Sequence, residues 1–505
     1  MRRPSAERWF DRLALAGAVL LYAVLALRRL DVPIPRYDEA EYAPQALEIL
    51  TSFAGGARHW PLMVSSYVGC PMSYVLAPFI AVWGLRVETL RVPAIAVALA
   101  AVLIFLYLIS RIFPRLPLWA PAAACLLNST FLISSRTGLY VDVSIHWLLM
   151  SLTLLCLWRW SLNRRPLDAF LAFFFVGFGI YSKIIFVWFA FPAALIVAYF
   201  SRRDGRAAQA RLAGACALGL FLGSLPLLIF NVRHRWKTAH MILDHLIQPN
   251  SPAAASNLSL FQNLATRGRH LLMMFNGGFL YPAGPLRTFS GAVLLILFAA
   301  GFFVVRKKAQ RAALAIAGAF IAALFFGSML TISTRQTEHL YPILPLMLLL
   351  AGVALAKLIP RRLPLLLACA LLLTPQVMHF NGYIEGMASA TDDHSPRALS
   401  SLSAFLTAAG VARPTALDWG ISNPLLVASG GKVAPDEDYD DKALRSLAPG
   451  STAVCYWTAA PPGIQGCGRL LRSDAFVLGE VRKFPDAPDA PVYAAIQVLG
   501  KRHGQ

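Results

Sequence analysis

Residues 90–110 read LRVPAIAVALAAVLIFLYLIS, and this stretch sets the class of protein. Arg91 is its only charged residue. A helix rises about 1.5 Å per residue, so about 20 apolar residues cross the ~30 Å hydrocarbon core of a bilayer. The stretch therefore predicts a membrane-spanning helix.

The composition of the whole chain is that of a protein with many such helices. Of the 505 residues, 57% are hydrophobic and 14% are charged, whereas an average soluble domain has about 25% charged residues. These proportions exclude a soluble globular enzyme, a disordered chain and a secreted disulfide scaffold. They predict a polytopic α-helical membrane protein.

Eleven apolar stretches are long enough to cross a bilayer. They cover roughly 13–30, 90–110, 117–135, 143–159, 167–181, 184–200, 212–230, 289–305, 312–332, 341–357 and 363–380. The first follows a basic segment without a small-residue cleavage site, so we expect it to remain as a span. Residues 72–85 are shorter and contain Pro78, which favours an interfacial or re-entrant helix. Residues 44–53 also have the pattern of an interfacial helix.

The charges of the loops predict the orientation of the chain. The net charge is +20, and the positive excess lies in residues 1–390, because residues 391–505 hold 11 basic and 12 acidic residues. One alternating set of short loops carries 20 basic residues, and the longer loops of the other set carry 15. Basic loops stay in the cytoplasm. We therefore expect a multi-pass protein of the cell inner membrane, with a cytoplasmic N-terminus and no nucleic-acid partner.

The same alternation predicts the domain organisation. Residues 1–380 form the transmembrane module, in which two long loops, 31–89 and 231–288, face the periplasm. Residues 381–505 form a small periplasmic α/β domain. Within this domain the sequence predicts helices at 397–409 and 441–447, and strands at 414–419, 452–457, 476–483 and 492–499.

Two cysteines, Cys455 and Cys467, lie in this outer domain, where an oxidising compartment permits a disulfide. Two reduced thiols are the alternative. No Cys or His spacing fits a zinc pattern, and the histidines of the second long loop are interpreted as ordinary loop residues. We therefore expect no metal site and no cofactor.

Carboxylates cluster in the first long loop, where Asp38, Glu39 and Glu41 fall within four residues. A capping box explains Asp38 and Glu41 as the start of a helix, but it leaves Glu39 unexplained. A further acid, Asp142, stands just before the fourth predicted span, where it is either an N-cap or a functional group. The positions of these acids predict chemistry at the outer surface of the membrane.

Cationic residues stand at the same outer ends of the spans. Lys183 lies in the tight turn between the fifth and sixth spans, and Arg335 and His339 precede a late span. A lysine that extends to the membrane interface is the structural alternative for Lys183. Carboxylates and cations together suit the transfer of a sugar from a lipid phosphate to a hydroxyl group. A carboxylate takes the hydroxyl proton, and cations stabilise the departing phosphate.

The order of these elements resembles the GT-C glycosyltransferases that use polyprenyl-phosphate sugars, in particular the bacterial protein-O-mannosyltransferase and lipid A aminoarabinose transferase group. The matching stretches are Asp38-Glu39-Ala40-Glu41-Tyr42-Ala43, Pro71 with Tyr74, Arg91, Val141-Asp142, Ser182-Lys183 and His339-Leu340-Tyr341-Pro342-Ile343-Leu344-Pro345. The resemblance implies an inverting transfer, with Asp38 as base or anchor, Glu39 beside it and Asp142 as a second acid. It also implies two interfacial helices in the first loop.

The chain departs from the family in its first loop. Gly69-Cys70-Pro71-Met72 stands where the family often has a Lys-Pro-Pro-Leu-like element. The lysine that meets the donor phosphate in the family is thus absent, and Lys183, Arg335, His339 and Arg58 are the candidates to bind that phosphate. Glu41 stands where aminoarabinose transferases tend to have a basic residue, which disfavours that donor. The resemblance implies a polyprenyl-phosphate sugar donor, surrounding membrane lipid and a glycan or lipid acceptor.

Two other functions remain open. One is a transporter or flippase, although the chain lacks internal repeats and midplane charges. The other is an oligosaccharyltransferase or polymerase that uses a diphosphate-linked donor, for which a metal requirement is expected.

Overall fold

The computed structural model describes residues 5–55, 60–137, 143–247, 260–278, 285–305, 307–329, 337–389, 396–437, 447–457, 466–473, 475–487 and 490–501. The chain divides into two compact units. Unit 1 comprises Met1–Arg28, Pro61–Pro71 and Ala94–Asn381, and unit 2 comprises Arg29–Trp60, Met72–Pro93 and Gly382–Gln505. Unit 2 therefore joins most of the first long loop to the C-terminal domain.

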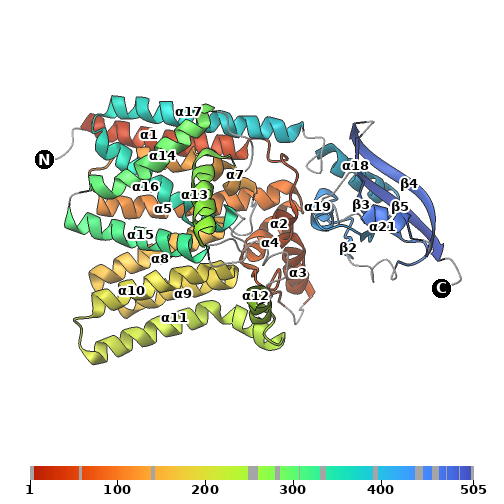
Figure 1. The fold of residues 1–505 in the computed structure, drawn as a ribbon, viewed down its shortest axis with the longest axis horizontal. Helices are drawn as coiled ribbons and strands as arrows, with labels where there is room; N and C mark the ends of the chain where they lie inside the picture. The colour runs from red at the N-terminus through yellow and green to blue at the C-terminus, as the bar shows by residue number, and fades with distance from the viewer. Residues whose placement is uncertain are drawn as a thin grey trace. The chain divides into compact units, whose positions relative to one another are not determined.

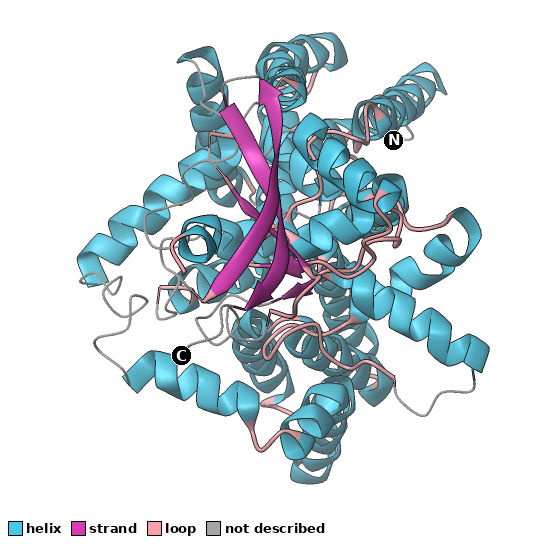
Figure 2. Ribbon diagram, turned by 90° about the vertical axis from the view of Figure 1, so that its right-hand side faces the viewer, coloured by secondary structure: helices cyan, strands magenta, loops and turns pink. Residues whose placement is uncertain are grey.

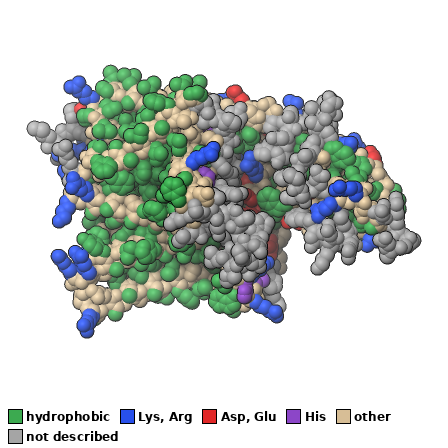
Figure 3. Space-filling model, viewed as in Figure 1, with side chains coloured by type: hydrophobic (Ala, Val, Ile, Leu, Met, Phe, Trp, Pro, Cys, Tyr) green, Lys and Arg blue, Asp and Glu red, His purple; other side chains and the backbone are tan. Residues whose placement is uncertain are grey.

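Within the described residues, eight helical segments are long and apolar enough to cross a membrane. They are α1 (Ser5–Leu27), α5 (Val87–Ile112), α8 (Val143–Asn163), η1 with α10 (Ile184–Phe189 and Ala190–Ser201), α11 (Arg206–Arg233), α15 (Lys308–Gly327), η3 with α16 (Thr337–Ile343 and Leu344–Leu358) and α17 (Arg362–Ala388). Most of these long apolar helices lie roughly parallel (Figure 1). Hydrophobic side chains cover them, and Lys and Arg gather at the end near the N-terminus (Figure 3). The protein is a multi-pass membrane protein, as its composition predicts.

Three further predicted spans take other forms. The stretch 167–181 forms the shorter apolar helix α9 (Pro166–Ser182). The stretch 289–305 lies in α14 (Pro285–Val304), in which the apolar helical segment is Thr288–Val304. The stretch 117–135 is interrupted, and it forms α6 (Trp119–Leu126) and α7 (Ser129–Thr137).

The interruption between α6 and α7 has a polar cause. Asn128 accepts a hydrogen bond from the backbone N–H of Phe131 at 3.2 Å and so caps α7. The side chain of Gln376 in α17 accepts hydrogen bonds from Asn128 and from the hydroxyl of Ser129. Because all these polar groups are fully buried, the network satisfies the backbone that the break exposes.

The long loops of the chain also contain helices. The first holds α2 (Tyr37–Ala40), α3 (Tyr42–Gly55) and α4 (Pro71–Trp83), and the second holds α12 (Lys237–Ile247) and α13 (Leu260–Asn276). The helix α3 covers the stretch 44–53, and α4 covers residues 72–83 of the stretch 72–85, in both of which the sequence predicts helices. Pro78 lies inside α4.

The C-terminal domain is a five-stranded mixed sheet with helices. Its elements are α18 (Pro396–Ala408), β1 (Thr415–Ala416), α19 (Ser422–Ala428), β2 (Asp436–Glu437), β3 (Thr452–Tyr456), α21 (Gly466–Leu471), β4 (Phe476–Ala487) and β5 (Ala490–Lys501). The strand order is β2-β1-β3-β5-β4. Strands β2, β1 and β3 pair in parallel, and β5 pairs antiparallel with β3 and β4. The long strands form a twisted ribbon (Figure 2). The α/β class predicted for this domain is confirmed, whereas the predicted helix 441–447 lies almost wholly outside the described residues.

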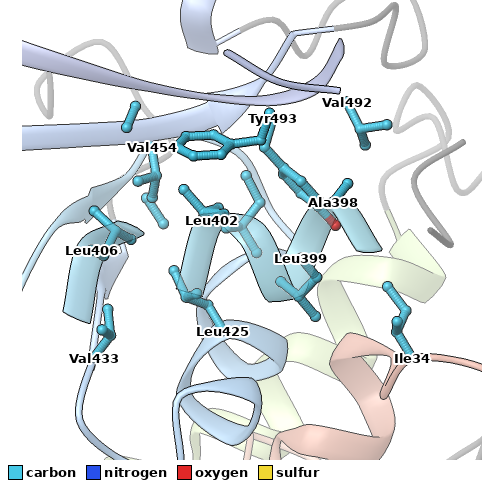
Figure 4. Packing of buried hydrophobic residues seen from close by; sticks show 14 residues of the cluster. Ile34, Ala398, Leu399, Leu402, Leu406, Leu425, Val433, Val454, Val492 and Tyr493 are labelled. Carbon is cyan, nitrogen blue, oxygen red and sulfur yellow. The ribbon is translucent and has the colours of Figure 1, made fainter. Parts of the chain in front are cut away.

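One side of the sheet packs on α18 and α19. Leu399, Leu402 and Leu425 from these helices meet Val454 and Tyr493 of the strands in a buried cluster (Figure 4). Ile34, from the first long loop, belongs to the same cluster and is 8% exposed. On another part of the sheet, Cys455 and Cys467 form a disulfide with a Cα–Cα distance of 5.4 Å. The C-terminal domain thus has its own core, and residue 34 of the chain is built into it.

Candidate functional site

Two of the predicted carboxylates lie on the one-turn helix α2 in unit 2. Asp38 and Glu39 are in its first turn, Glu41 closes it, and α3 begins at Tyr42. The N-cap position belongs to Arg36, whose side chain makes no capping hydrogen bond. Asp38 is therefore not a capping residue, and the capping box does not account for this cluster.

Glu39 is fixed by a buried ion pair with Arg91 of α5. The Nε of Arg91 donates to Oε1 of Glu39 at 2.6 Å, and Nη2 donates to Oε2 at 2.8 Å. Both side chains are buried, with 0% and 4% exposure. The Nη1 of Arg91 also donates to the carbonyl of Leu30 at 2.5 Å. A two-pronged guanidinium–carboxylate pair fixes the orientation of both groups. Glu39 thus anchors α2, and Asp38, the preceding residue, is half-buried.

The C-terminal domain contacts the other side of α2. Tyr37 donates its hydroxyl to Glu437, at the end of β2, and its ring lies 4.7 Å from the ring of Trp419. Ser422, the first residue of α19, donates its hydroxyl to the same carboxylate. The helix that carries Asp38 is therefore fastened both to α5 and to the sheet of the C-terminal domain, all within unit 2.

Lys183 occupies a tight turn in unit 1 between α9 and η1. Its backbone is extended and pairs with Val68 in an isolated β-bridge. Next to this bridge, the N–H of Gly69 donates to the carbonyl of Ser182 at 2.9 Å. A Cβ on Gly69 would overlap Tyr181, so this close approach requires glycine. The Gly69-Cys70-Pro71 element therefore packs directly on the turn that carries Lys183.

Lys183 lies within electrostatic reach of two histidines from other helices. Its charge acts on His146 in α8 and on His339 in η3. The indole N–H of Trp147 donates to the carbonyl of Tyr341 at 2.7 Å and so fastens α8 to η3. Two of the predicted phosphate-binding residues, Lys183 and His339, are thus brought together within unit 1.

Arg267 of α13 adds a second permanent cation near His339. Its side chain is fully buried, and its Nη2 donates to the carbonyl of Ser328 at 3.0 Å. Burial lowers the pKa of Arg267 to about 10, and the charge of Glu338 opposes this shift. The guanidinium therefore remains charged at neutral pH. We call the two cations, Lys183 and Arg267, together with the imidazoles of His146 and His339, the basic cluster.

The predicted site residues fall into three groups. Asp38 and Glu39 belong to unit 2, and Lys183 and His339 belong to unit 1. Asp142, Arg58 and Arg335 lie outside the described residues. Among the described residues no group of three or more His, Cys, Asp or Glu side chains could hold a metal ion.

Sequence reasoning missed several participants. Arg267 stands in a long polar loop, where its residue type carries no signal of burial, and His146 resembles any polar residue near the start of a span. Glu437 lies almost 400 residues from α2. A buried arginine in a helix of a long loop becomes recognisable only when the helix is packed against its neighbours.

The fold matches that of solved proteins over nearly the full length of the chain. ArnT from Cupriavidus metallidurans, solved bound to undecaprenyl phosphate, superimposes with a TM-score of 0.64 at 14% identity, over 97% of this chain and 98% of that one. Its apo state gives the same TM-score at 15% identity. The archaeal oligosaccharyltransferase AglB from Archaeoglobus fulgidus gives a TM-score of 0.45 at 14% identity, over 86% of this chain and 65% of that one.

ArnT is a GT-C aminoarabinose transferase, so the chain has the GT-C fold that the order of its motifs indicates. No protein-family model matches the chain, and no curated protein matches it by sequence.

Proposed function

We propose that the protein is a membrane glycosyltransferase that moves a sugar from a polyprenyl-phosphate donor to a hydroxyl group of a glycan or lipid acceptor. The observation that carries the proposal is the likeness to ArnT, a protein solved with undecaprenyl phosphate bound, over 97% of the chain. We further propose that the reaction takes place on the periplasmic side of the cell inner membrane, as the loop charges predict.

The basic cluster supports a donor that carries phosphate. Lys183 and Arg267 are cations that both act on His339. Cations in a partly buried setting stabilise the charge that develops on a leaving phosphate. In this proposal Lys183, on the turn against Gly69 and Cys70, takes the place of the family lysine that the first loop lacks.

Asp38 is proposed as the general base. Its carboxylate would take the proton of the acceptor hydroxyl while the acceptor oxygen forms a bond to the anomeric carbon of the sugar. The bond between that carbon and the phosphate oxygen breaks on the opposite face, and the configuration inverts. Polyprenyl phosphate then leaves as an anion and needs no general acid.

Glu39 serves this proposal as a positioning residue, because both of its oxygens already accept hydrogen bonds from Arg91. The ion pair limits the movement of α2 and so of Asp38. Asp142 remains the proposed second acid, and Arg335 and Arg58 remain proposed phosphate ligands.

The test is turnover by the purified full-length protein supplied with polyprenyl-phosphate sugars and hydroxyl acceptors, with release of polyprenyl phosphate as the readout. Asp38→Asn should abolish release and leave the thermal unfolding temperature unchanged. Lys183→Gln should raise the KM for the donor. Lys432→Gln, an exposed cation of the C-terminal domain, is the matched control and should behave as wild type.

Three results would contradict parts of the proposal. Turnover of Asp38→Asn at the wild-type rate would remove Asp38 as the base. Activity that disappears with a chelator would favour a diphosphate-linked donor. Uptake of a polar substrate into proteoliposomes without covalent change would favour a transporter.

A further inference from the structure

A dense group of cations stands where α11 ends in unit 1. The segment Arg233-His234-Arg235-Trp236-Lys237, which we call the cationic turn, connects α11 to α12. All five of its residues are exposed. The nearest acidic residues in the sequence are Asp204 and Asp244, so none lies within six residues of the cationic turn.

The backbone of the cationic turn is held in an unfavourable conformation. Arg235 and Trp236 have φ values of 53° and 61°, in the left-handed region that residues with a Cβ rarely adopt. Buried Asn231 maintains this conformation, because its carbonyl accepts the N–H of Trp236 at 2.7 Å and its side chain accepts the N–H of Thr238 at 3.1 Å. Strained backbone that the surrounding structure maintains is typical of functional positions.

The same end of unit 1 carries Lys183. Thr238 donates its hydroxyl to the carbonyl of Ser66 at 2.5 Å, and the hydroxyl of Ser66 lies 3.1 Å from the sulfur of Met241. Ser66 is two residues from Val68, which pairs with Lys183. The α11 helix has 28 residues, which is about 42 Å at 1.5 Å per residue and enough to cross a bilayer. The cationic turn is therefore at the membrane boundary opposite to Arg206, where α11 begins.

Topology does not account for these charges. The positive-inside bias explains the arginines at the Arg206 end of α11 but not an equally dense group at its other end. The indole of Trp236 is 52% exposed beside them, and tryptophan favours the interface between membrane and water. Anionic lipid headgroups attract such basic segments next to a span.

We infer that the cationic turn is a binding site for the phosphate of anionic lipid headgroups at the membrane surface that carries Lys183. Arg233, Arg235 and Lys237 supply the charge, and the strained turn holds them on one rigid loop. The inference does not rest on the sugar transfer proposed above, because none of these three residues is proposed to act in that reaction.

The inference is tested by the retention of phosphatidylglycerol on the detergent-purified full-length protein, measured by native mass spectrometry. The triple variant R233Q/R235Q/K237Q should bind phosphatidylglycerol about fivefold more weakly for each cation removed, since each cation contributes about 1 kcal/mol. Binding of phosphatidylcholine should be weak and equal in both proteins. Arg235→Lys, which keeps the charge, should bind like wild type.

A matched control removes the same net charge from the C-terminal domain, through K432Q/R472Q/K501Q. It should retain phosphatidylglycerol as wild type does. Displacement by inorganic phosphate would assign recognition to the phosphate group alone, and its failure to displace would assign recognition to phosphate carried by a lipid. Equal retention by wild type and the turn variant, at equal unfolding temperatures, would overturn the inference. So would an equal loss in the control.

Discussion

The hydroxyl of Tyr37 donates to the carboxylate of Glu437, 3.0 Å from Oε1 and 3.2 Å from Oε2, across 400 residues of sequence. The ring of Trp419 packs against Tyr37. Tyr37 immediately precedes Asp38 in α2. The C-terminal domain therefore contacts the turn of helix that carries the proposed base.

The first prediction concerns this contact. Tyr37→Phe removes a hydrogen bond worth about 0.5–1.5 kcal/mol and frees one side of α2. We expect kcat for polyprenyl phosphate release to fall by up to about tenfold at an unchanged donor KM. Glu437→Leu should reproduce the loss, whereas Glu437→Gln keeps an acceptor oxygen and should stay close to wild type. Unchanged turnover in both Tyr37→Phe and Glu437→Leu would show that the contact does not position Asp38.

The second prediction concerns the buried pair of Glu39 and Arg91. Removal of one partner leaves an uncompensated buried charge, which typically costs about 3–5 kcal/mol. Glu39→Leu and Arg91→Met should each lower the thermal unfolding temperature measured in detergent. The double variant should recover much of that loss, because two apolar side chains leave no charge unpaired. An additive loss in the double variant would contradict this account of the pair.

The third prediction concerns the contact between α9 and α11. Small residues allow membrane helices to approach closely, and the two helices do so at Gly219 and Gly223. A Cβ added to Gly219 would overlap the backbone oxygen of Phe170, and one added to Gly223 would overlap that of Phe174. Gly219→Ala and Gly223→Ala should each lower the unfolding temperature, with a cost of roughly 1–3 kcal/mol.

Gly214, on the same helix, is the control for these substitutions because no atom lies within 4 Å of its added Cβ. Gly214→Ala should leave the unfolding temperature unchanged or raise it, since alanine favours helix over glycine by up to about 1 kcal/mol. Equal effects at positions 214, 219 and 223 would refute the packing explanation.

The fourth prediction concerns pH. Burial, followed by the charge of Arg267, lowers the pKa of His270 to about 4, against about 6.5 in an unfolded chain. The contribution of neutral His270 to the free energy of unfolding is present above about pH 6.5. It is lost as the pH falls toward 4, because the unfolded state binds the proton more readily than the folded state. Complete loss amounts to something on the order of 3 kcal/mol. Nδ1 of His270 lies 3.4 Å from Arg267 Nη1, and His270→Gln keeps an acceptor there.

Unfolding temperatures recorded between neutral pH and pH 4 test this assignment. Wild type should lose stability on acidification, and His270→Gln should lose less. Parallel curves for the two proteins would exclude His270 as the group responsible.

Much of the transmembrane architecture could be predicted from the sequence, because a span is recognised from one apolar stretch alone. The length of that stretch must match the thickness of the bilayer. Ten of the eleven predicted spans are helical at their expected places, either as one helix or as two helices that follow each other directly. The exception, 117–135, breaks at Asn128 because Gln376, almost 250 residues away, satisfies the polar groups of the break. The pattern of residues within 117–135 therefore could not reveal that Gln376 is the partner.

The candidate site divides in the same way. The sequence by itself determined which ends of the spans carry acids and cations, because charged residues are rare in this chain and avoid the hydrocarbon core. Only the tertiary structure decided that Arg91 occupies both oxygens of Glu39, that Glu437 reaches Tyr37, and that Arg267 and Lys183 both act on His339. Those contacts join residues far apart in the chain, and they depend on how helices and sheet pack, which hydrophobic periodicity leaves undetermined.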